Sequence, residues 1–530
     1  MTNSIGELAE AECILITGSN TTEQHPIIAG KILEALKKGA KLIIFDPRRI
    51  QLTPYADMHL SQKPGTDVAY LNAMMKVMID EGLYDREFVE GRADGFDELK
   101  ASLCDCTPGW ASDITGIPAD DIVKAARMFA GASSASIVYC MGITQHASGT
   151  DNVKALANLA MLTGNVGFPS TGVNPLRGQN NVQGACDMGG LPDVYPGYQK
   201  VEDETAAGKF EQAWGRALPR KPGLTLMEMM DAAARGEIRF MFILGENPLV
   251  SDPNINHVRE ALGALDFLVV QDIMKTETTA LADVVLPGAC WAEKDGTFTN
   301  TERRVQRVRK AVEPPGEALA DWEIICRIAR AMDAGGFDFG SAVEIFAEIA
   351  SLTPQYAGIT SERLGTSGLQ WPCTSVDDPG TVFLHKDRFT RGKGQFQVTG
   401  YRPPAELPDA EYPLVLMTGR LAFHYHTGTM TRTSPTLDRE VSKAFIEINP
   451  TDASAHGITS GGPVKVSSRR GEITVEALVT DRVKPGEVFI PFHFAESAAN
   501  MLTNDALDPV SRIPELKVCA VRVESAKSRP

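Results

Sequence analysis

A strand, a helix and a second strand occur in the same order at two places in this chain, and this repeat constrains the fold more than any other feature. The first copy has apolar runs at 13–18 and 41–45, separated by a helix that Pro26 opens and Gly39 ends. Short apolar strands joined through a helix are typical of parallel strands covered by helices on both faces. The first copy therefore predicts a βαβ unit.

The second copy matches the first in spacing as well as in order. Its strands are expected at 240–244 and 267–271, with a helix through 257–262. Both copies end the first strand with a glycine, Gly18 or Gly245, which an asparagine follows two residues later. Both end the second strand with an aspartate, Asp46 or Asp272, and reach an Ala-Asp pair at the same distance beyond it. This agreement indicates two lobes related by duplication.

The ends of these strands carry residue types that bind nucleotides. A glycine turn at a helix start leaves room for a pyrophosphate, and a carboxylate after the next strand commonly binds ribose hydroxyls. Neither copy contains the GxGxxG pattern of an ordinary dinucleotide fold. Two nucleotide-binding lobes are therefore one interpretation. The other is a pair of α/β layers whose strand ends happen to carry Gly and Asp.

The pattern changes after Tyr412, where strand-like runs alternate with Gly and Pro turns. The runs are 414–417, 463–467, 473–479 and 487–491. They predict a C-terminal β-barrel, so the expected fold class is α/β, with two related dinucleotide-binding lobes plus a barrel. The charged segment 201–222 is expected to be a surface excursion. The expected domains are part of the first lobe at 1–170, the second lobe at 171–365, a linker at 366–410 and the barrel at 411–530.

One arginine, Arg177, lies in a loop of distinctive composition. The loop, residues 172–199, is rich in Gly, Asn, Gln and Pro, which let the backbone approach a ligand and supply amide groups to bind it. A guanidinium matches a carboxylate in bidentate geometry, so a small carboxylate is the ligand expected for Arg177. A structural salt bridge is the alternative role, and the surrounding ligand-type residues favour binding.

Charge and cysteine spacing exclude several classes of protein. A net charge of -16 argues against binding to nucleic acid or an anionic membrane. No apolar run approaches the roughly 20 residues that span a bilayer. The nine cysteines form no CxxC pair, which argues against zinc and iron–sulfur motifs and indicates reduced thiols. Without a visible signal peptide, a cytoplasmic protein with no direct membrane insertion is expected.

Several segments, spread over the whole chain, resemble one enzyme family. They are PLRGQNNVQGACDMG, LPDVYPGYQ, ANLAMLTGNVG, GSNTTEQHP, DPRR, GENPL, ADVVLP, EKDGTFTN and TGR. The chain resembles the catalytic (alpha) subunit of molybdopterin-dependent formate dehydrogenases, within the dimethyl sulfoxide reductase family. That resemblance implies a barrel of the double-psi type and two molybdopterin guanine dinucleotides around one molybdenum or tungsten, one dinucleotide in each lobe.

The resemblance, together with the repeat, also assigns roles to single residues. Arg177 would orient formate beside the metal, with Gln179 nearby as a second catalytic residue. His25, just before a helix, would either cap that helix or contact a ligand. His424 and His426 lack a third ligand at suitable spacing, so a metal pair is not expected. The residues expected to contact the first dinucleotide are Asn20, Glu23, Asp46 and Arg48. Those expected to contact the other are Asn247, Gln271, Asp321, Arg420, His424 and His426. Gln145, on the segment that approaches the pterins, and the repeat residues Gly18, Gly245 and Asp272 complete the expected cofactor contacts.

The implied reaction is the two-electron oxidation of formate to carbon dioxide. Formate is anionic and carbon dioxide is neutral, so Arg177 would hold the substrate more strongly than the product. Iron–sulfur or flavin electron-transfer subunits are the expected partners. Two other functions remain open, a non-catalytic scaffold subunit of a redox complex and another molybdopterin oxidoreductase such as a nitrate reductase.

The resemblance also implies parts that this sequence does not contain. Family members carry an N-terminal iron–sulfur region and a cysteine or selenocysteine metal ligand before a histidine. This chain starts inside the family's first lobe, so an N-terminal truncation is expected, with the metal ligand and iron–sulfur cluster upstream of Met1 and no metal ligand in this chain. A missing N-terminal segment or a complementary polypeptide would complete the enzyme. Without that ligand the isolated chain would be inactive.

Overall fold

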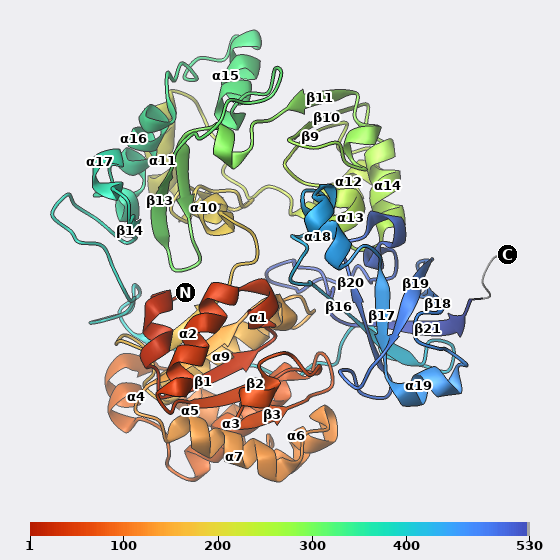
Figure 1. Ribbon diagram of the computed structural model, residues 1–530. Helices are drawn as coiled ribbons and strands as arrows, with labels where there is room; N and C mark the ends of the chain where they lie inside the picture. Colours follow the sequence, from red (N-terminus) through yellow and green to blue (C-terminus); the bar gives the residue numbers. More distant parts are fainter. Residues whose placement is uncertain (527–530) are drawn as a thin grey trace. The chain divides into compact units, whose positions relative to one another are not determined.

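Residues 1–526 are described by the computed structural model, and they form two compact units (Figure 1). The first unit contains Met1–Gly178, Val250–Asn256 and the chain from Phe383 onward, and the second contains Gln179–Leu249 and His257–Val382. This division groups the C-terminal barrel with the first lobe. The domain boundaries expected from the sequence, at 170, 365 and 410, remain predictions.

The first unit is built on a five-stranded sheet whose neighbouring strands are all parallel. Its spatial order is β3 (Met58–Leu60), β2 (Lys41–Phe45), β1 (Cys13–Thr17), β5 (Ala135–Tyr139) and β6 (Gly172–Pro175). The order places the first βαβ copy at β1 and β2, as the sequence predicts. The other elements are α1 (Thr21–Gln24), α4 (Arg86–Arg92), α5 (Phe96–Ser102), α6 (Pro108–Thr115), α8 (Met141–Thr144), α9 (Gly149–Leu162) and the pair β4 (Ala93–Asp94) and β15 (Gly394–Gln395).

Both faces of this sheet are covered, which explains why its strands are apolar without alternation. On β1, Ile14 and Ile16 belong to the core that also contains the buried face of α2 (Pro26–Lys37). Cys13 and Leu15 point to the opposite face, where the core contains residues of α3 (Asp67–Asp80) and α7 (Ala119–Ala130). Figure 1 shows α2 on one side of these strands and α3 and α7 on the other. Two covered faces make every position of the strand a buried one.

The second unit contains a three-stranded parallel sheet in the order β11 (Val284–Pro287), β10 (Phe267–Asp272) and β9 (Phe240–Leu244). These strands confirm the second βαβ copy. The helix expected through 257–262 is α14 (Ile255–Gly263). The remaining strands are β7 (Val194–Tyr195), β8 (Gln199–Lys200), β12 (Gly296–Thr299), β13 (Arg304–Val308) and β14 (Leu369–Gln370). The remaining helices are α10 (Val182–Asp187), α11 (Glu204–Trp214), α12 (Leu226–Ala234), α15 (Asp321–Ala331), α16 (Ala342–Leu352) and α17 (Ser361–Leu364), and α13 (Pro248–Ser251), like α14, has residues in both units.

The two copies share hydrogen bonds as well as sequence spacing. Each first-strand glycine has a positive φ, +59° for Gly18 and +63° for Gly245. Each donates its N–H to the end of the neighbouring strand, Gly18 to Phe45 O (3.4 Å) and Gly245 to Gln271 O (2.8 Å). A positive φ suits glycine because it has no Cβ. In both lobes the chain therefore makes the same turn after the first strand.

The aspartates of the repeat have matching roles too. In the Ala-Asp pairs, Asp57 Oδ2 accepts from the Leu42 N–H (2.9 Å) and Asp283 Oδ2 from the Leu268 N–H (2.7 Å). Each acceptor ties the start of the third strand to the second residue of the strand beside it. Because both lobes have this aspartate–backbone hydrogen bond at the same place, a duplication explains their similarity better than a chance resemblance of two α/β layers.

The C-terminal part forms a closed six-stranded barrel, as the sequence predicts. Its order is β16 (Leu414–Gly419), β20 (Glu487–Pro491), β17 (Phe445–Ile448), β19 (Glu472–Val479), β18 (Pro463–Ser467) and β21 (Cys519–Ser525). Ile473, Val475 and Ala477 of β19 point into its core, between exposed neighbours. Two short helices, α18 (Pro435–Glu440) and α19 (Pro450–Ala455), lie in its connections. Strands β17 and β21 were not predicted.

The charged segment 201–222 differs from its expected form. It contains α11, whose Ala207 and Phe210 are buried against Tyr195. Asp203 caps the helix by accepting from the N–H groups of Thr205 and Ala206 (2.9 Å each). The surface excursion is thus partly a docked helix. Within residues 1–526, no helix is both long and apolar enough to cross a membrane.

Candidate active site

The carboxyl ends of β1 and β5 touch in the first unit, and two glycines make the contact. The Gly142 N–H donates to the carbonyl oxygen of Gly18 (3.0 Å). A Cβ atom on Gly142 would lie 2.8 Å or less from the Cα, C and O atoms of Gly18. Ligands of parallel α/β sheets bind outside the carboxyl ends of the strands. This edge is therefore where the first dinucleotide is expected.

Arg177 follows β6 at the same edge, and hydrogen bonds hold the main chain around it. The Leu176 N–H donates to Tyr139 O (2.8 Å), and the Cys140 thiol donates to Leu176 O (3.0 Å). His25 Nε2–H donates to the carbonyl oxygen of Arg177 itself (2.8 Å). His25 makes no side-chain capping bond to α2, so its side chain serves the loop of Arg177 instead.

Three cationic side chains gather around the buried Cys140. Burial raises the pKa of the Cys140 thiol, while the positive charges of Arg420, Lys517 and Arg177 act against this rise. Within residues 1–526 the Arg420 side chain has no hydrogen bond or ion pair, and its Cζ atom lies 5.8 Å from the centroid of the Phe492 ring. Lys517 Nζ donates to the carbonyl oxygen of Thr418 (2.9 Å), and burial, with repulsion from Arg420, lowers the pKa of Lys517 to about 7. Clustered cations of this kind favour an anionic ligand.

Gly178 brings the Arg177 loop directly against one of these cations. A Cβ atom on Gly178 would lie 3.0 Å or less from the Nη1, Nη2 and Cζ atoms of Arg420. A side chain at 178 would displace the guanidinium. The glycine after Arg177 therefore permits two arginines to share one small region.

Buried histidines in the first unit are held in the neutral state. Burial lowers the pKa of His146 and of His426 to about 4 and that of His493 to about 3, and it also lowers the pKa of His25. His493 Nδ1–H donates to His426 O (2.5 Å), and its Nε2 accepts from the Leu421 N–H (2.9 Å). The Nδ1 atoms of His25 and His146 are buried and have no hydrogen-bond partner within residues 1–526. These nitrogens can accept from a ligand.

A chain of hydrogen bonds leads from the end of β1 to a buried acid that the sequence did not reveal. Thr17 Oγ1 and Tyr70 Oη are 2.8 Å apart, and Tyr70 donates to Asp67 Oδ1 (3.2 Å). Gln62 Nε2 donates to the same oxygen (3.3 Å), while Gln62 Oε1 is buried without a partner in the described chain. Burial raises the pKa of Asp67 to about 7.

Two more buried carboxyl groups belong to this region. Asp46 Oδ1 accepts from the Arg48 N–H (2.9 Å), and burial raises the pKa of Asp46 to about 6. Burial raises the pKa of Glu487 to about 7, and the charge of Asp46 adds to the rise for both Glu487 and Asp67. Buried acceptors of this kind fit a ligand rich in N–H and O–H donors, such as guanine and ribose.

Other residues expected to contact the first dinucleotide have protein partners. Arg48 is ion-paired with the buried Glu447 (Nη2–Oε2 2.8 Å), so its charge is neutralised within the protein. Glu23 accepts from Gln51 Nε2 (3.4 Å). Asn20 is buried two residues after Gly18. Their cofactor contacts stay predictions.

His424 and Gln145 also lie in the first unit. Both ring nitrogens of His424 are bonded within the protein, Nδ1 to Thr431 Oγ1 (3.2 Å) and Nε2 to Val441 O (2.6 Å). His424 thus stabilises its own loop. Gln145 directly follows α8, beside His146. Gln179 opens the second unit, where its carbonyl oxygen accepts from Val182 (3.5 Å), and its catalytic role stays a prediction.

In the second unit, three residues expected to contact the other dinucleotide come together at the end of β10. Gln271 Nε2 donates to Asp321 Oδ1 (2.7 Å), and Lys294 forms an ion pair with the other oxygen of Asp321. Gln271 Oε1 is buried without a partner in residues 1–526. Gly288 leaves room beside Asp321 and Asp272 because it has no side chain. A Cβ atom at this position would lie 3.3 Å from Asp321 Oδ1 and 3.8 Å from Asp272 O.

Two further features surround this group. Asn247 Oδ1 accepts from Thr278 Oγ1 (2.7 Å), and its Nδ2 donates to Glu277 Oε2 (2.8 Å), which ties the turn after Gly245 to the loop after β10. A hollow of about 260 Å³ adjoins Asp321, with apolar walls that include Trp322. An apolar wall beside a carboxylate suits a planar polar ring.

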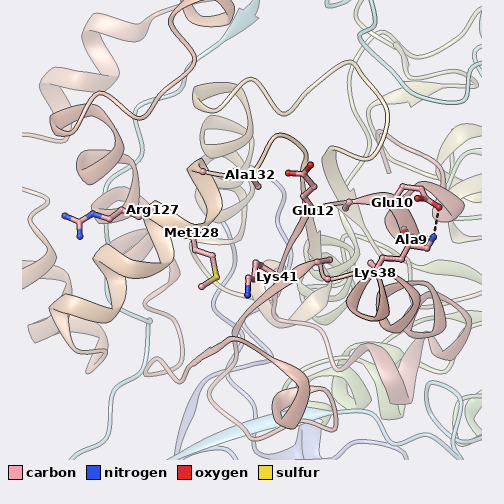
Figure 2. A pocket seen from close by; sticks show the side chains of 13 residues that line it. Ala9, Glu10, Glu12, Lys38, Lys41, Arg127, Met128 and Ala132 are labelled. Carbon is pink, nitrogen blue, oxygen red and sulfur yellow. Dashed lines mark hydrogen bonds and ion pairs between the residues drawn. The ribbon is translucent and has the colours of Figure 1, made fainter.

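The amino edge of the first-unit sheet carries a separate hollow of about 480 Å³, shown in Figure 2. The cationic side chains that line it are already paired, Lys38 with Glu10 (2.7 Å), Lys41 with Asp57 (2.8 Å) and Arg127 with Glu81 (2.7 Å). It lies at the end of the strands opposite to Arg177. Neither its place nor its charges favour a dinucleotide.

The residues of the first unit fit the cofactor that the resemblance implies. Arg420 and Lys517 suit phosphate groups, and the buried acids suit guanine and ribose. Among residues 1–526, no group of three or more His, Cys, Asp or Glu side chains could hold a metal ion. Sequence reasoning missed five residues of this region: Gln62, Asp67, His146, Glu487 and Lys517.

One of the missed residues had a usable signal. Asp67 directly follows the Gly65-Thr66 pair, and a Gly-Thr pair occurs in both copies of the repeat. Lys517 and Glu487 lie in the barrel, far along the chain from Asp46 and Cys140. No local pattern marks them, because only folding brings them to this edge.

Comparison with known protein families agrees with these features. The family described as Molybdopterin oxidoreductase matches residues 1–331, and the Molydopterin dinucleotide binding domain matches residues 414–520. Together the two matches contain both copies of the repeat and most of the barrel.

Individual relatives are similar over nearly the whole chain. The "F420-dependent formate dehydrogenase subunit alpha" of Methanocaldococcus jannaschii is 56% identical over 527 residues, which cover 99% of this chain and 78% of that protein. "Formate dehydrogenase H" of Escherichia coli is 43% identical, covering 99% and 74%. The expected N-terminal truncation is not established by these matches.

A solved structure has the same fold. Acetylene hydratase from Pelobacter acetylenicus has a TM-score of 0.76 and 22% identity, covering 98% of this chain and 81% of that one. At this identity the likeness concerns the fold alone.

Proposed function

Because this chain belongs to the molybdopterin oxidoreductase family, we propose that it is the catalytic alpha subunit of a formate dehydrogenase, which oxidises formate to carbon dioxide. The observation that carries the proposal is its 56% identity, over 99% of its length, to a protein named as such a subunit. The second line of support is Arg177, placed at the carboxyl edge of the sheet with Arg420 and Lys517 close by.

The proposed cofactor is a pair of molybdopterin guanine dinucleotides with molybdenum or tungsten, which supplies the acceptor for two electrons. In the first unit, the phosphates would be held by Arg420 and Lys517, and the guanine and ribose by Asp46, Asp67 and Gln62. The unpartnered Gln62 Oε1 gives this assignment a structural basis, since a buried acceptor without a donor is costly.

In the second unit, we assign the other nucleotide to the group at the end of β10. Gln271 Oε1 is again a buried acceptor without a partner in the described chain, and Asp321 and Asp272 lie beside it. Asn247 and Gly245 shape the turn next to them. The two lobes would then bind alike because they share the same turn and aspartate devices.

Arg177 would bind the substrate carboxylate through its planar fork. The guanidinium orients formate and attracts it as an anion. It loses most of that attraction once the product is neutral, so product release follows from the change of charge. Gln179 is proposed as a second group for the same substrate. Neighbouring cations strengthen the field that draws a small anion to this edge.

The protein would work with electron-transfer subunits. The relative from Methanocaldococcus jannaschii is itself named as a subunit, and the net charge of -16 leaves small molecules and proteins as the suitable partners. Iron–sulfur and flavin proteins are suitable partners, because their redox groups can accept the two electrons that formate leaves on the cofactor, one at a time or as a pair.

Replacing Arg177 with Lys tests the proposal in cofactor-loaded protein. Lysine keeps the charge and loses the bidentate fork, so we expect the KM for formate to rise at least about tenfold and kcat to fall. Arg388→Lys, at an exposed position, is the matched control and should leave both constants unchanged. Wild-type formate kinetics in Arg177→Lys would remove Arg177 from the substrate site.

A further inference from the structure

The main chain that carries Arg177 is held by side chains rather than by a continuing strand. Strand β6 ends at Pro175, and the next two carbonyl groups each accept from a side chain. Leu176 O accepts from Cys140 (3.0 Å), and Arg177 O accepts from His25 (2.8 Å). The two donors come from separate elements, the end of β5 and the residue before α2.

The hydrogen bond between His25 and Arg177 determines which nitrogen of the His25 ring carries a proton. A carbonyl oxygen can only accept, so the Nε2 atom of His25 must carry a proton. His25 Nδ1 is buried without a partner in residues 1–526, and burial with the nearby charge of Arg420 lowers the pKa of the ring. The ring is therefore the neutral Nε2–H tautomer.

We propose that His25 is a positioning residue for Arg177: its Nε2–H fixes the Arg177 carbonyl, and thereby the direction in which the guanidinium leaves the main chain. This inference rests on the proposed role of Arg177 in binding formate. The role acts through the carbonyl oxygen of Arg177, and it assigns His25 no contact with the substrate. Its closeness to Arg177 in space could not be read from residues 152 positions apart in the sequence.

The neighbouring contacts limit how large the effect can be. Cys140 still anchors Leu176, and Gly178 still meets Arg420, when the His25 bond is lost. Arg177 would then keep its charge in the site but sample more than one direction. Losing one hydrogen bond of this kind corresponds to about tenfold in binding.

The first experiment compares His25→Leu with His25→Gln in the cofactor-loaded protein. Leucine fills similar space without a donor, whereas glutamine places an amide N–H near the position of Nε2. We expect His25→Leu to raise the KM for formate about tenfold, with a smaller change in kcat, and His25→Gln to restore most of the loss. The inhibition constant of nitrate, a small planar anion, should rise in parallel with KM.

A merely structural role would give a different result. It would lower the pterin content and kcat together and leave the KM and the nitrate constant unchanged. That outcome, or wild-type constants in His25→Leu, would overturn the inference. His456→Leu, a histidine on the barrel, is the matched control and should change neither constant.

A second measurement needs no activity. Nitrogen-15 NMR of histidine-labelled protein without cofactor should show His25, identified by its loss in His25→Gln, protonated at Nε2 and bare at Nδ1 at pH 7. The opposite tautomer would overturn the inference. The proposed function fails separately, if Arg177→Lys leaves formate kinetics intact. Impaired Arg177→Lys with unimpaired His25→Leu would remove only the positioning role.

Discussion

Three buried carboxyl groups near the carboxyl edge of the first-unit sheet lower the stability of the protein at neutral pH. Asp46, Asp67 and Glu487 are buried carboxyl groups whose pKa values rise to about 6, 7 and 7. An acid with a raised pKa in the folded state stabilises the fold at low pH, and this contribution is lost as the pH rises from its unfolded to its folded pKa. At neutral pH these groups favour a ligand that donates hydrogen bonds to them.

Asp67→Asn should therefore stabilise the cofactor-free protein in a pH-dependent way. Asparagine can still accept from Tyr70 but cannot ionise, so the free energy of unfolding at pH 8 should rise by about 4 kcal/mol. The gain should shrink towards zero as the pH falls below about 4, where the carboxyl group of the unfolded chain also becomes protonated. Urea unfolding at several pH values measures it. An equal gain at pH 8 and pH 5 would contradict the account, and the exposed Asp338→Asn is the control.

The sequence revealed Arg177 because its loop has an unusual local composition. It did not reveal Lys517 or Glu487, because each is an ordinary residue of the barrel until folding brings it beside Cys140 or Asp46. From the sequence, His25 could either cap a helix or contact a ligand, because only folding brings it beside Arg177. Its hydrogen bond to Arg177 joins the residue before α2 to the end of β6.

At the scale of elements, the first lobe depends on a close backbone contact between the segments that follow β1 and β5. Gly142→Ala would place a methyl group 2.8 Å or less from three backbone atoms of Gly18. We expect a loss of about 2 kcal/mol in the free energy of unfolding, because neither backbone can move aside cheaply. Gly30→Ala, inside α2 with nothing near its Cβ position, should instead gain about 0.5–1 kcal/mol.

Chemical denaturation of both variants decides this point. The pair is matched, since each adds one methyl group to a glycine of the first unit. Equal stability of Gly142→Ala and the wild-type protein would show that the loops are not in close contact.

Elements with a clear local pattern were predicted, and those that depend on partners were not. Strands β1, β2, β9 and β10 are short apolar runs between turns, and all four were expected. Strand β17 was missed because its sequence includes Glu447, an acid that the barrel buries by pairing it with Arg48 and Arg482. The docked helix α11 was missed because charged residues surround Ala207 and Phe210.

At the scale of the whole molecule, the repeat explains the architecture. Two lobes with the same glycine turn and the same Asp–backbone bond stand in separate compact units, and a barrel completes the first. The family match at 1–331 and the barrel match at 414–520 follow the same organisation. The proposed pair of dinucleotides gives each lobe a ligand.

Once loaded with cofactor, this protein is expected to take electrons from formate. The most direct measurement is the reduction of an artificial redox dye by the purified protein, with whatever subunits accompany it and with its pterin content determined on the same sample. The account predicts formate-dependent dye reduction that Arg177→Lys impairs. Pterin-loaded protein that leaves the dye oxidised with formate, or that instead oxidises reduced dye with nitrate, would contradict it.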